Sequence, residues 1–413
     1  MKKAIVYLVV LFTPILLISQ ETSVPSYKFS GFVKNDLFWD SRQTVDIREG
    51  HFLLYPKQIK ADPSGTDINA HSSFNFLAIQ SRLKLDLTGP EALGAKTSGM
   101  MEGEFFGMSE SDINGFRLRH ALIKLNWPTT ELMIGQFWHP MFATNCFPDV
   151  VSFNTGVPFL VFSRNPQIRL TQDIGKFKAY MTLLSQLDFK SNGPLLGVSS
   201  TYLRNSGIPS LNVNLEYSTK NTDRKTGFLA GIAGNFKKLT PRLEVSGVKV
   251  NTSLMSFSYM AYLKAEVPLL TLKAAGYYGQ NTFDYTMLGG YVEFPDLNDP
   301  TRYMYENVHI VSAWTELMTN GSKFKAGLFM GYSKNYGTDQ SLPSGTNYYS
   351  RGDNIDRIYR ISPRAVWNFG KFRIAPEVEY TVAYYGTKDG SGAVKEASPV
   401  GNLRLLTGVF YFF

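Results

Sequence analysis

The sequence predicts an all-β fold: a transmembrane, antiparallel up-and-down β-barrel of about 16 strands, with long external loops and short periplasmic turns. Three observations support this prediction. Apolar and polar residues alternate over many segments, and the links between these segments are alternately short and long. The chain also ends on an alternating segment whose last residue is the aromatic Phe413.

The alternation has a period of two, which indicates β-strands with one apolar face. In the segment 252–266, Met255, Phe257 and Tyr259 share one face, and Ser256 shares the other with further polar residues. Soluble β-sandwiches also alternate, but their strands are usually about five or six residues long. The segments here are about 9–14 residues long, enough for a tilted strand to cross a bilayer. Charges on many polar faces suit a water-filled lumen better than a packed core.

The links between the predicted strands fall into two classes that alternate along the chain. Tight turns are expected at residues 128–130, 173–175, 267–268, 319–322 and 370. External loops are expected at residues 42–72, 109–114, 139–165, 189–207, 237–251, 280–307, 337–354 and 386–400, and all of them except 109–114 are long. In outer-membrane barrels the short turns face the periplasm and the long loops face outside. An even number of strands therefore places both chain ends in the periplasm.

The N-terminus has the pattern of an export signal. Lys2 and Lys3 precede an apolar run over residues 4–18, which polar residues follow. This run is shorter than the roughly 20 residues that span a bilayer as a helix, so residues 1–20 are predicted to be a secretory signal peptide. Residues 21–413 then form one barrel domain in the outer membrane of a Gram-negative-type bacterium. Cys146 is the single cysteine, which excludes an internal disulfide framework.

The last segment, Leu403–Phe413, is predicted to be the closing strand of the barrel. Leu405, Val409 and Tyr411 lie on its apolar face, which we expect to contact outer-membrane lipids. Pairing with the first segment, 27–41, would leave no open sheet edge. A terminal aromatic residue on such a strand resembles the signal that the barrel-assembly machinery reads.

The third long loop, 139–165, is the most distinctive stretch of the chain. It is long, rich in Phe and Pro, and poor in charge. Such a loop would be stable inside the lumen, where it would narrow the pore, and long structureless loops are usually functional. The alternative is a loop that packs on the barrel rim or on a neighbouring subunit.

Four short stretches resemble the DcaP-like trimeric porin family of outer membranes. They are GQFWHP at Gly135–Pro140, SRNPQIRLT at Ser163–Thr171, FRLRHA at Phe116–Ala121 and YGQN at Tyr278–Asn281. The resemblance implies a sixteen-stranded homotrimer whose third loop constricts each channel. The long loops depart from the family pattern, so a ligand preference cannot be carried over.

The charged residues predicted to line the pore come from the polar faces of the strands and from the third loop. They are Arg82, Lys84, Glu102, Glu104, Asp149, Arg164, Arg169, Lys178, Arg360, Arg364, Arg373 and Glu377. Basic residues outnumber acidic ones, which favours anions. Any single charge is more often one half of a structural ion pair than a selectivity residue. Arg117 and Arg119 fall on the apolar register of their strand, which leaves three placements: above the lipid, in a trimer contact, or beyond a β-bulge.

Two functions follow from these observations. The first is a porin for passive diffusion of small polar, preferentially anionic solutes. The alternative is a non-conducting structural or accessory barrel of a larger outer-membrane assembly, which would need its lumen charges paired or plugged. The five histidines are scattered, so an enzyme is not expected. The sequence predicts no cofactor, no metal site and no nucleic-acid partner; Asp296, Asn298 and Asp299 are better explained by a turn than by a calcium site.

Overall fold

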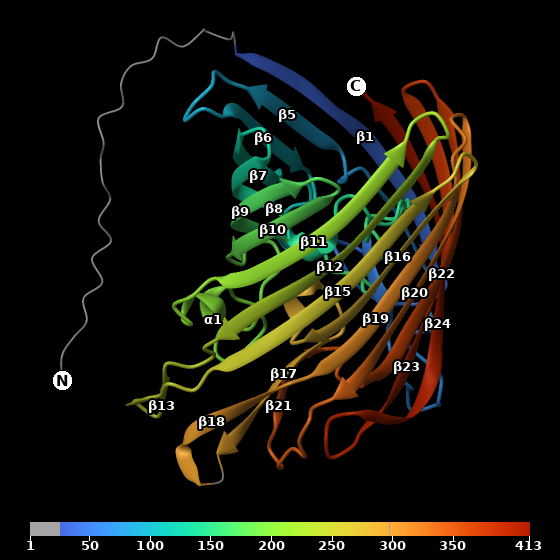
Figure 1. Ribbon diagram of the computed structural model, residues 1–413. Helices are drawn as coiled ribbons and strands as arrows, with labels where there is room; N and C mark the ends of the chain where they lie inside the picture. The colour runs from blue at the N-terminus through green and yellow to red at the C-terminus, as the bar shows by residue number, and fades with distance from the viewer. Residues whose placement is uncertain (1–24, 297) are drawn as a thin grey trace, which may run out of the picture.

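The computed structural model describes residues 25–296 and 298–413, with the side chain of residue 300 left out, and its barrel is shown in Figure 1. The predicted signal peptide, residues 1–20, lies outside the described residues. The barrel strands are β1 (Ser26–Asp40), β4 (Ser73–Leu77), β5 (Arg82–Thr88), β6 (Lys96–Glu104), β7 (Arg117–Asn126), β8 (Thr130–Trp138), β9 (Arg164–Ile174), β10 (Phe177–Leu184), β11 (Ser210–Asn221), β12 (Thr226–Leu239), β15 (Leu254–Glu266), β16 (Leu270–Gln280), β19 (His309–Thr319), β20 (Phe324–Gly337), β22 (Ile355–Phe369), β23 (Phe372–Lys388) and β24 (Val394–Phe412).

These strands form one closed antiparallel sheet in sequence order. β4 and β5 both pair with β1, so they count as one broken strand, and the 17 labelled strands form a barrel of sixteen. β1 also pairs with β24, from Phe32 opposite Phe412 to Asp40 opposite Arg404. The predicted closure of the barrel by its first and last strands is therefore confirmed.

The two faces of the strands differ as the alternation predicted. On β15 the side chains are buried and exposed in turn, with Met255, Phe257 and Tyr259 exposed on the outer face. Leu405 and Tyr411 are likewise exposed on the outer face of β24, whereas Arg404 points inward and is buried. A continuous apolar surface of this extent is stable against lipid, not against water. Among the described residues, no helix is long and apolar enough to cross a membrane.

The long links carry secondary structure of their own. They contain the hairpin of β2 (Thr44–Ile47) and β3 (Phe52–Pro56), the hairpin of β13 (Glu244–Val245) and β14 (Val248–Lys249), the sheet of β17 (Gly289–Asp296), β18 (Asp299–Asn307) and β21 (Asn347–Arg351), the helix α1 (Thr201–Arg204), and the single turns Glu110–Asp112, Pro140–Phe142 and Phe283–Tyr285. α1, β13, β17, β18 and β21 gather at the end of the barrel opposite residues 25 and 413 (Figure 1). We call this the external end and the other the turn end.

The prediction of a long loop at residues 386–400 is wrong. The segment 386–400 is mostly strand, because β23 and β24 continue as a hairpin to Lys388 and Val394. The turn between them is held by Asp389, whose Oδ1 accepts hydrogen bonds from the backbone N of Ser391 (2.9 Å) and of Ala393 (3.0 Å). This side-chain cap lets the hairpin close within five residues.

Candidate functional site

The segment 139–163 between β8 and β9, called loop 3 here, crosses to the inner face of the opposite wall. Arg360 on β22 donates from Nη1 to the carbonyl of Val157 (2.8 Å), and Ser312 on β19 donates to the carbonyl of Phe159 (3.0 Å). Phe159 also packs over Gly331 on β20, at a place where a Cβ would collide with its ring. Loop 3 therefore lies inside the barrel and not on its rim.

Buried carboxylates of this opposite wall hold the polar groups of loop 3. Glu316 accepts from the backbone N of Asp149 (2.8 Å), and Glu379 accepts from Nδ2 of Asn154 (2.7 Å). Glu377 accepts from the backbone N of Val151. Hydrogen bonds to charged groups are stronger than neutral ones in a site that excludes water. We call Glu316, Glu377 and Glu379 the anchoring carboxylates.

The first long loop, 41–72, also enters the lumen, which the sequence analysis did not predict. Arg360 donates from Nη2 to the carbonyl of Leu54 (3.0 Å), and Tyr385 donates to the carbonyl of Pro56 (2.6 Å). Four consecutive apolar residues, Phe52–Tyr55, are all buried. Such an unbroken apolar run in a loop was the available signal, because a strand with one wet face would alternate.

The first long loop, called loop 1 here, builds an apolar core inside the barrel together with loop 3 and Phe106, which lies between β6 and β7. The rings of Phe52 and Phe162 lie 5.1 Å apart, and those of Phe106 and Phe153 lie 4.2 Å apart. All four side chains are at most 2% exposed. Aromatic pairs at these separations stabilise beyond their buried area alone, so this part of the lumen has a packed core.

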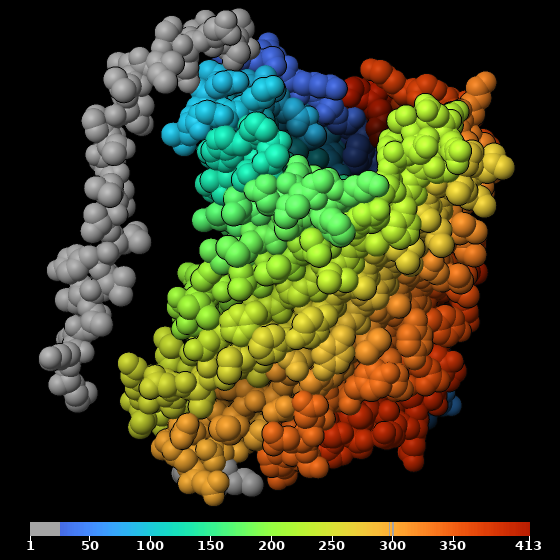
Figure 2. All heavy atoms as spheres, viewed as in Figure 1, coloured from blue at the N-terminus to red at the C-terminus, as the bar shows by residue number. Residues whose placement is uncertain are grey.

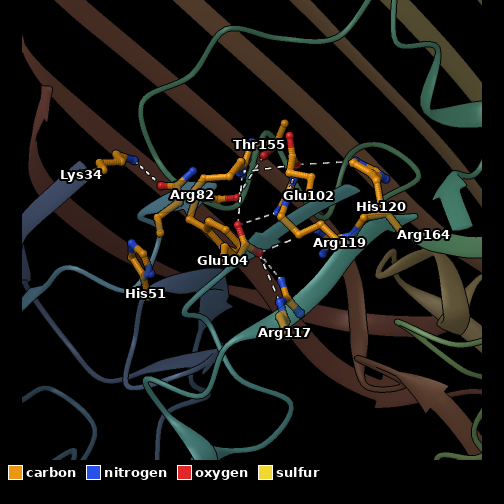
Figure 3. A network of polar contacts seen from close by, with 12 residues as sticks. Lys34, His51, Arg82, Glu102, Glu104, Arg117, Arg119, His120, Thr155 and Arg164 are labelled. Atoms are coloured by element: carbon orange, nitrogen blue, oxygen red, sulfur yellow. Dashed lines mark hydrogen bonds and ion pairs between the residues drawn. The ribbon is translucent and has the colours of Figure 1, made fainter. Parts of the chain in front are cut away.

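A second group of buried charges gathers around Glu104 on β6 (Figure 3). Its carboxylate lies 2.6 Å from Arg117, 2.6 Å from Arg119 and 3.1 Å from Arg82. Arg164 lies 3.7 Å from it. Glu102 and Asp188 complete the group, at 2.7 Å from Arg119 and from Arg164 respectively. We call these seven residues the arginine cluster.

Arg117 and Arg119 reach this cluster because of a β-bulge. The pairing of β6 with β7 shifts register between Glu102, which lies opposite His120, and Gly103, which lies opposite Leu118. The extra residue on β7 reverses the side-chain alternation beyond that point and turns both arginines inward. Of the three placements that the sequence left open, the one beyond a bulge is the one observed.

A cavity of about 610 Å³ lies between loop 3, the arginine cluster and the turn-end parts of β20, β23 and β24. The turn end of the barrel is visibly hollowed between β1 and the β11–β12 hairpin (Figure 2). The basic side chains that line the cavity are Lys34, Arg82, Lys84, Arg119, Lys325, Arg364 and Arg373. Its acidic lining residues are Glu102 and Asp149. Buried carboxylates offset part of this basic excess, because Glu104 pairs with Arg82 and Arg119, and Glu316 pairs with Arg364.

The predicted pore-lining residues separate into three groups. Those that line the cavity are Arg82, Lys84, Glu102, Asp149, Arg364 and Arg373. Those buried behind it are Glu104 and Arg164 in the arginine cluster and Arg360 and Glu377 against loop 3. Arg169 and Lys178 lie elsewhere: Arg169 donates to the carbonyl of Trp138 (3.0 Å), and Lys178 pairs with Asp173 at a tight turn, 42% exposed.

Three lining or supporting residues were missing from the predicted set. Lys34 is fully buried and donates to the carbonyl of Val151 (2.7 Å). Lys325 lines the cavity, and Glu316 pairs with Arg364 (2.6 Å) as well as with loop 3. All three lie on the polar faces of alternating strands, so the alternation that found the other residues contained this signal as well.

No family model and no curated protein matches this sequence. Solved structures do match its fold. The outer-membrane channel DcaP of Acinetobacter baumannii aligns with 96% of this chain and 100% of its own, at 15% identity and a TM-score of 0.68. The outer-membrane protein OmpT of Vibrio cholerae, in its trimer form, covers 95% and 100% at 12% identity and a TM-score of 0.53. OmpF of Salmonella typhi, in complex with daunomycin, covers 94% and 97% at 13% identity and a TM-score of 0.51.

At these identities the likeness concerns the fold. It agrees with the closed sixteen-stranded sheet described above. The chain is a closed sixteen-stranded β-barrel with the porin fold, and 96% of it aligns with the DcaP channel.

Proposed function

We propose that this barrel is a porin through which small polar solutes, preferentially anions, diffuse passively. The observation that carries the proposal is the cavity of about 610 Å³, lined by seven basic and two acidic side chains. A cavity with one sign of charge and low-dielectric walls raises the local concentration of counter-ions.

Two of the basic side chains in the cavity are available to solutes. Among the described residues, no carboxylate forms an ion pair with Lys325 or with Arg373. Arg373 is held in place by Asn368, to whose Oδ1 it donates from Nε (2.8 Å). In contrast, Arg119 and Arg364 are neutralised by their partners. Lys325 and Arg373 are therefore the proposed selectivity residues.

Loop 3 is proposed to constrict the pathway, together with loop 1. Its contacts with the opposite wall support a solute route that passes between the loop and the strands that line the cavity. By analogy with the trimer form of the Vibrio protein, we also propose that three chains assemble. The exposed aromatic end at Phe413 is proposed to guide insertion by the barrel-assembly machinery.

Conductance in planar bilayers under a salt gradient tests this proposal. The expected result is stepwise conductance in groups of three, with a reversal potential on the anion-selective side. The double variant Lys325→Gln with Arg373→Gln should shift that potential toward cation selectivity, because both unpaired charges are removed. Lys178→Gln is the matched control, since Lys178 lies outside the cavity. Equal shifts in both variants would contradict the assignment of the cavity as the selective region.

The second candidate is a non-conducting structural barrel. The packed core of loops 1 and 3 and the paired charges of the arginine cluster favour it, because a closed lumen requires both. It predicts no conductance from folded trimers and co-purification with other outer-membrane components. Any stepwise conductance from the pure protein would exclude this candidate.

A further inference from the structure

Three potential metal ligands meet at the external end of the barrel, whereas the cavity lies toward the turn end. Glu306 lies near the end of β18, His309 begins β19, and Asp339 follows β20 by two residues. One ligand atom of each residue lies within 4.8 Å of the others. The pairing of β19 with β20 shifts register at His309, a local irregularity that re-aims side chains.

The imidazole of His309 is fixed on one side and unsatisfied on the other. Its Nδ1 lies 2.6 Å from the hydroxyl of Tyr278. Its Nε2 lies 3.1 Å from Oδ2 of Asp339, yet it makes no hydrogen bond among the described residues. The side chain is only 9% exposed. A buried ring nitrogen without a hydrogen bond needs an explanation, and a ring held through Nδ1 is the arrangement of a histidine that binds metal through Nε2.

The charges around this nitrogen also favour a cation. Within the described part of the chain, no lysine or arginine forms an ion pair with Glu306 or Asp339. Two facing carboxylates without a positive partner repel each other, and a divalent ion between them removes that cost.

We propose that Glu306, His309 and Asp339 bind a divalent transition-metal cation of the zinc type. One imidazole nitrogen and two carboxylate oxygens are ligands that Zn²⁺ accepts, with a fourth position left for water. Ca²⁺ fits less well, because it prefers six to eight oxygen ligands. The ion would link three elements: the β17–β18 hairpin, the barrel strand β19 and the loop that follows β20.

The predicted consequence of binding is a cross-link between the end of β18, the start of β19 and the residues directly after β20. The contact of His309 with Asp339 links only β19 to the segment after β20, and the pairing of β17 with β21 holds the β17–β18 hairpin at a different place. The side chain of Asp339 is 72% exposed, which gives an ion a route to the site from outside. The site is separate from the proposed porin function, because none of its residues lines the cavity.

Calorimetric titration of ZnCl₂ into the chelator-treated full-length mature protein in detergent tests the proposal. The wild type should bind one ion per chain saturably. His309→Ala should abolish this binding, and Glu306→Gln and Asp339→Asn should each weaken it. Tyr278→Phe should weaken it by about 10–100-fold, the usual effect of removing a partner that orients a metal ligand. His71→Ala, at an exposed histidine of loop 1, is the matched control and should bind as the wild type does.

Saturable binding that persists unchanged in His309→Ala would overturn the proposal, as would an absence of saturable binding to the wild type. Heat-modifiable migration in electrophoresis verifies that each variant is folded. If His309→Ala does not fold, X-ray absorption at the zinc edge of the wild type decides, since it must show the outer-shell scattering of one imidazole ring beside the nearest ligand atoms. A spectrum without imidazole scattering would contradict the site. Conductance of the metal-free wild type tests the porin proposal separately from the metal site, because none of the three ligands lines the cavity.

Discussion

The two inner walls of the barrel both bury charged side chains, but they use them differently. In the arginine cluster, Glu104 and its neighbouring arginines neutralise one another within the wall itself. On the opposite wall, the anchoring carboxylates also accept hydrogen bonds from loop 3. The first wall is thus a fixed scaffold, whereas the second is a docking face. Buried charge stabilises the wall itself in the arginine cluster, whereas at the anchoring carboxylates it positions a loop against the wall.

Removing the central acid of the arginine cluster should have the largest effect. Glu104→Ala leaves several buried arginines without their shared partner, which is expected to destabilise the protein by about 3–5 kcal/mol. Urea unfolding in detergent, followed by tryptophan fluorescence, measures this. Glu244→Ala is the control, because the side chain of Glu244 on β13 is exposed. Equal losses of unfolding free energy in the two variants would contradict the structural role assigned to the arginine cluster.

Loosening the docking face should release loop 3 without unfolding the wall. Asn154→Ala removes the bond to Glu379, while Arg360 still pairs with that carboxylate (3.3 Å). Loss of one hydrogen bond to a charged group costs about 1.5–3 kcal/mol, so the undocked population should rise roughly 10–100-fold.

Cys146 in loop 3 reports this release. Burial raises the pKa of its thiol to about 11, so less thiolate is present at pH 8 than for a free cysteine, and maleimide labelling should be slow by about two orders of magnitude. Labelling should accelerate in Asn154→Ala. It should stay slow in Thr144→Ala, which changes an exposed residue of the same loop. Rapid labelling of the wild type would show that loop 3 is not docked.

A steric change on the docking face should give the smallest effect. Gly331→Ala places a methyl group against the ring of Phe159, and overpacking of this kind costs about 1–3 kcal/mol. Gly276→Ala is the matched control, because the nearest atom to its added Cβ is the carbonyl oxygen of Ser312 at 4.0 Å. Conductance and Cys146 labelling should change in the first variant only. No difference between them would show that the ring of Phe159 has room to shift.

The sequence predicted the barrel well, because side-chain alternation records which face of each strand meets lipid. Strand number, the closure by β1 and β24 and the inward direction of Arg82, Glu102 and Glu104 all followed from it. Side-chain alternation gave the wrong direction where one extra residue changes the register, as at the bulge that turns Arg117 and Arg119 inward. It was also silent on loops, whose positions depend on contacts with distant strands, so the entry of Phe52–Tyr55 into the lumen was missed.

The proposed metal site of Glu306, His309 and Asp339 could not be predicted from the sequence for the same reason. Glu306 and His309 are three residues apart, which is a recognisable spacing, but Asp339 arrives from the other end of a hairpin. Alternation says nothing about which loops meet above a barrel. Only the pairing of β19 with β20 brings the third ligand to the first two.

The contacts of loop 1 have a consequence for how the barrel forms. Its carbonyl groups at Gly50, Leu54 and Pro56 are bound by Arg404, Arg360 and Tyr385, which belong to the last three strands of the chain. A loop near the beginning of the chain therefore cannot complete its hydrogen bonds until the end of the chain is in place. The pairing of β1 with β24 and the packing of loop 1 in the lumen are therefore expected to form together. A chain that lacks its last strands would have neither the closed sheet nor the packed loop.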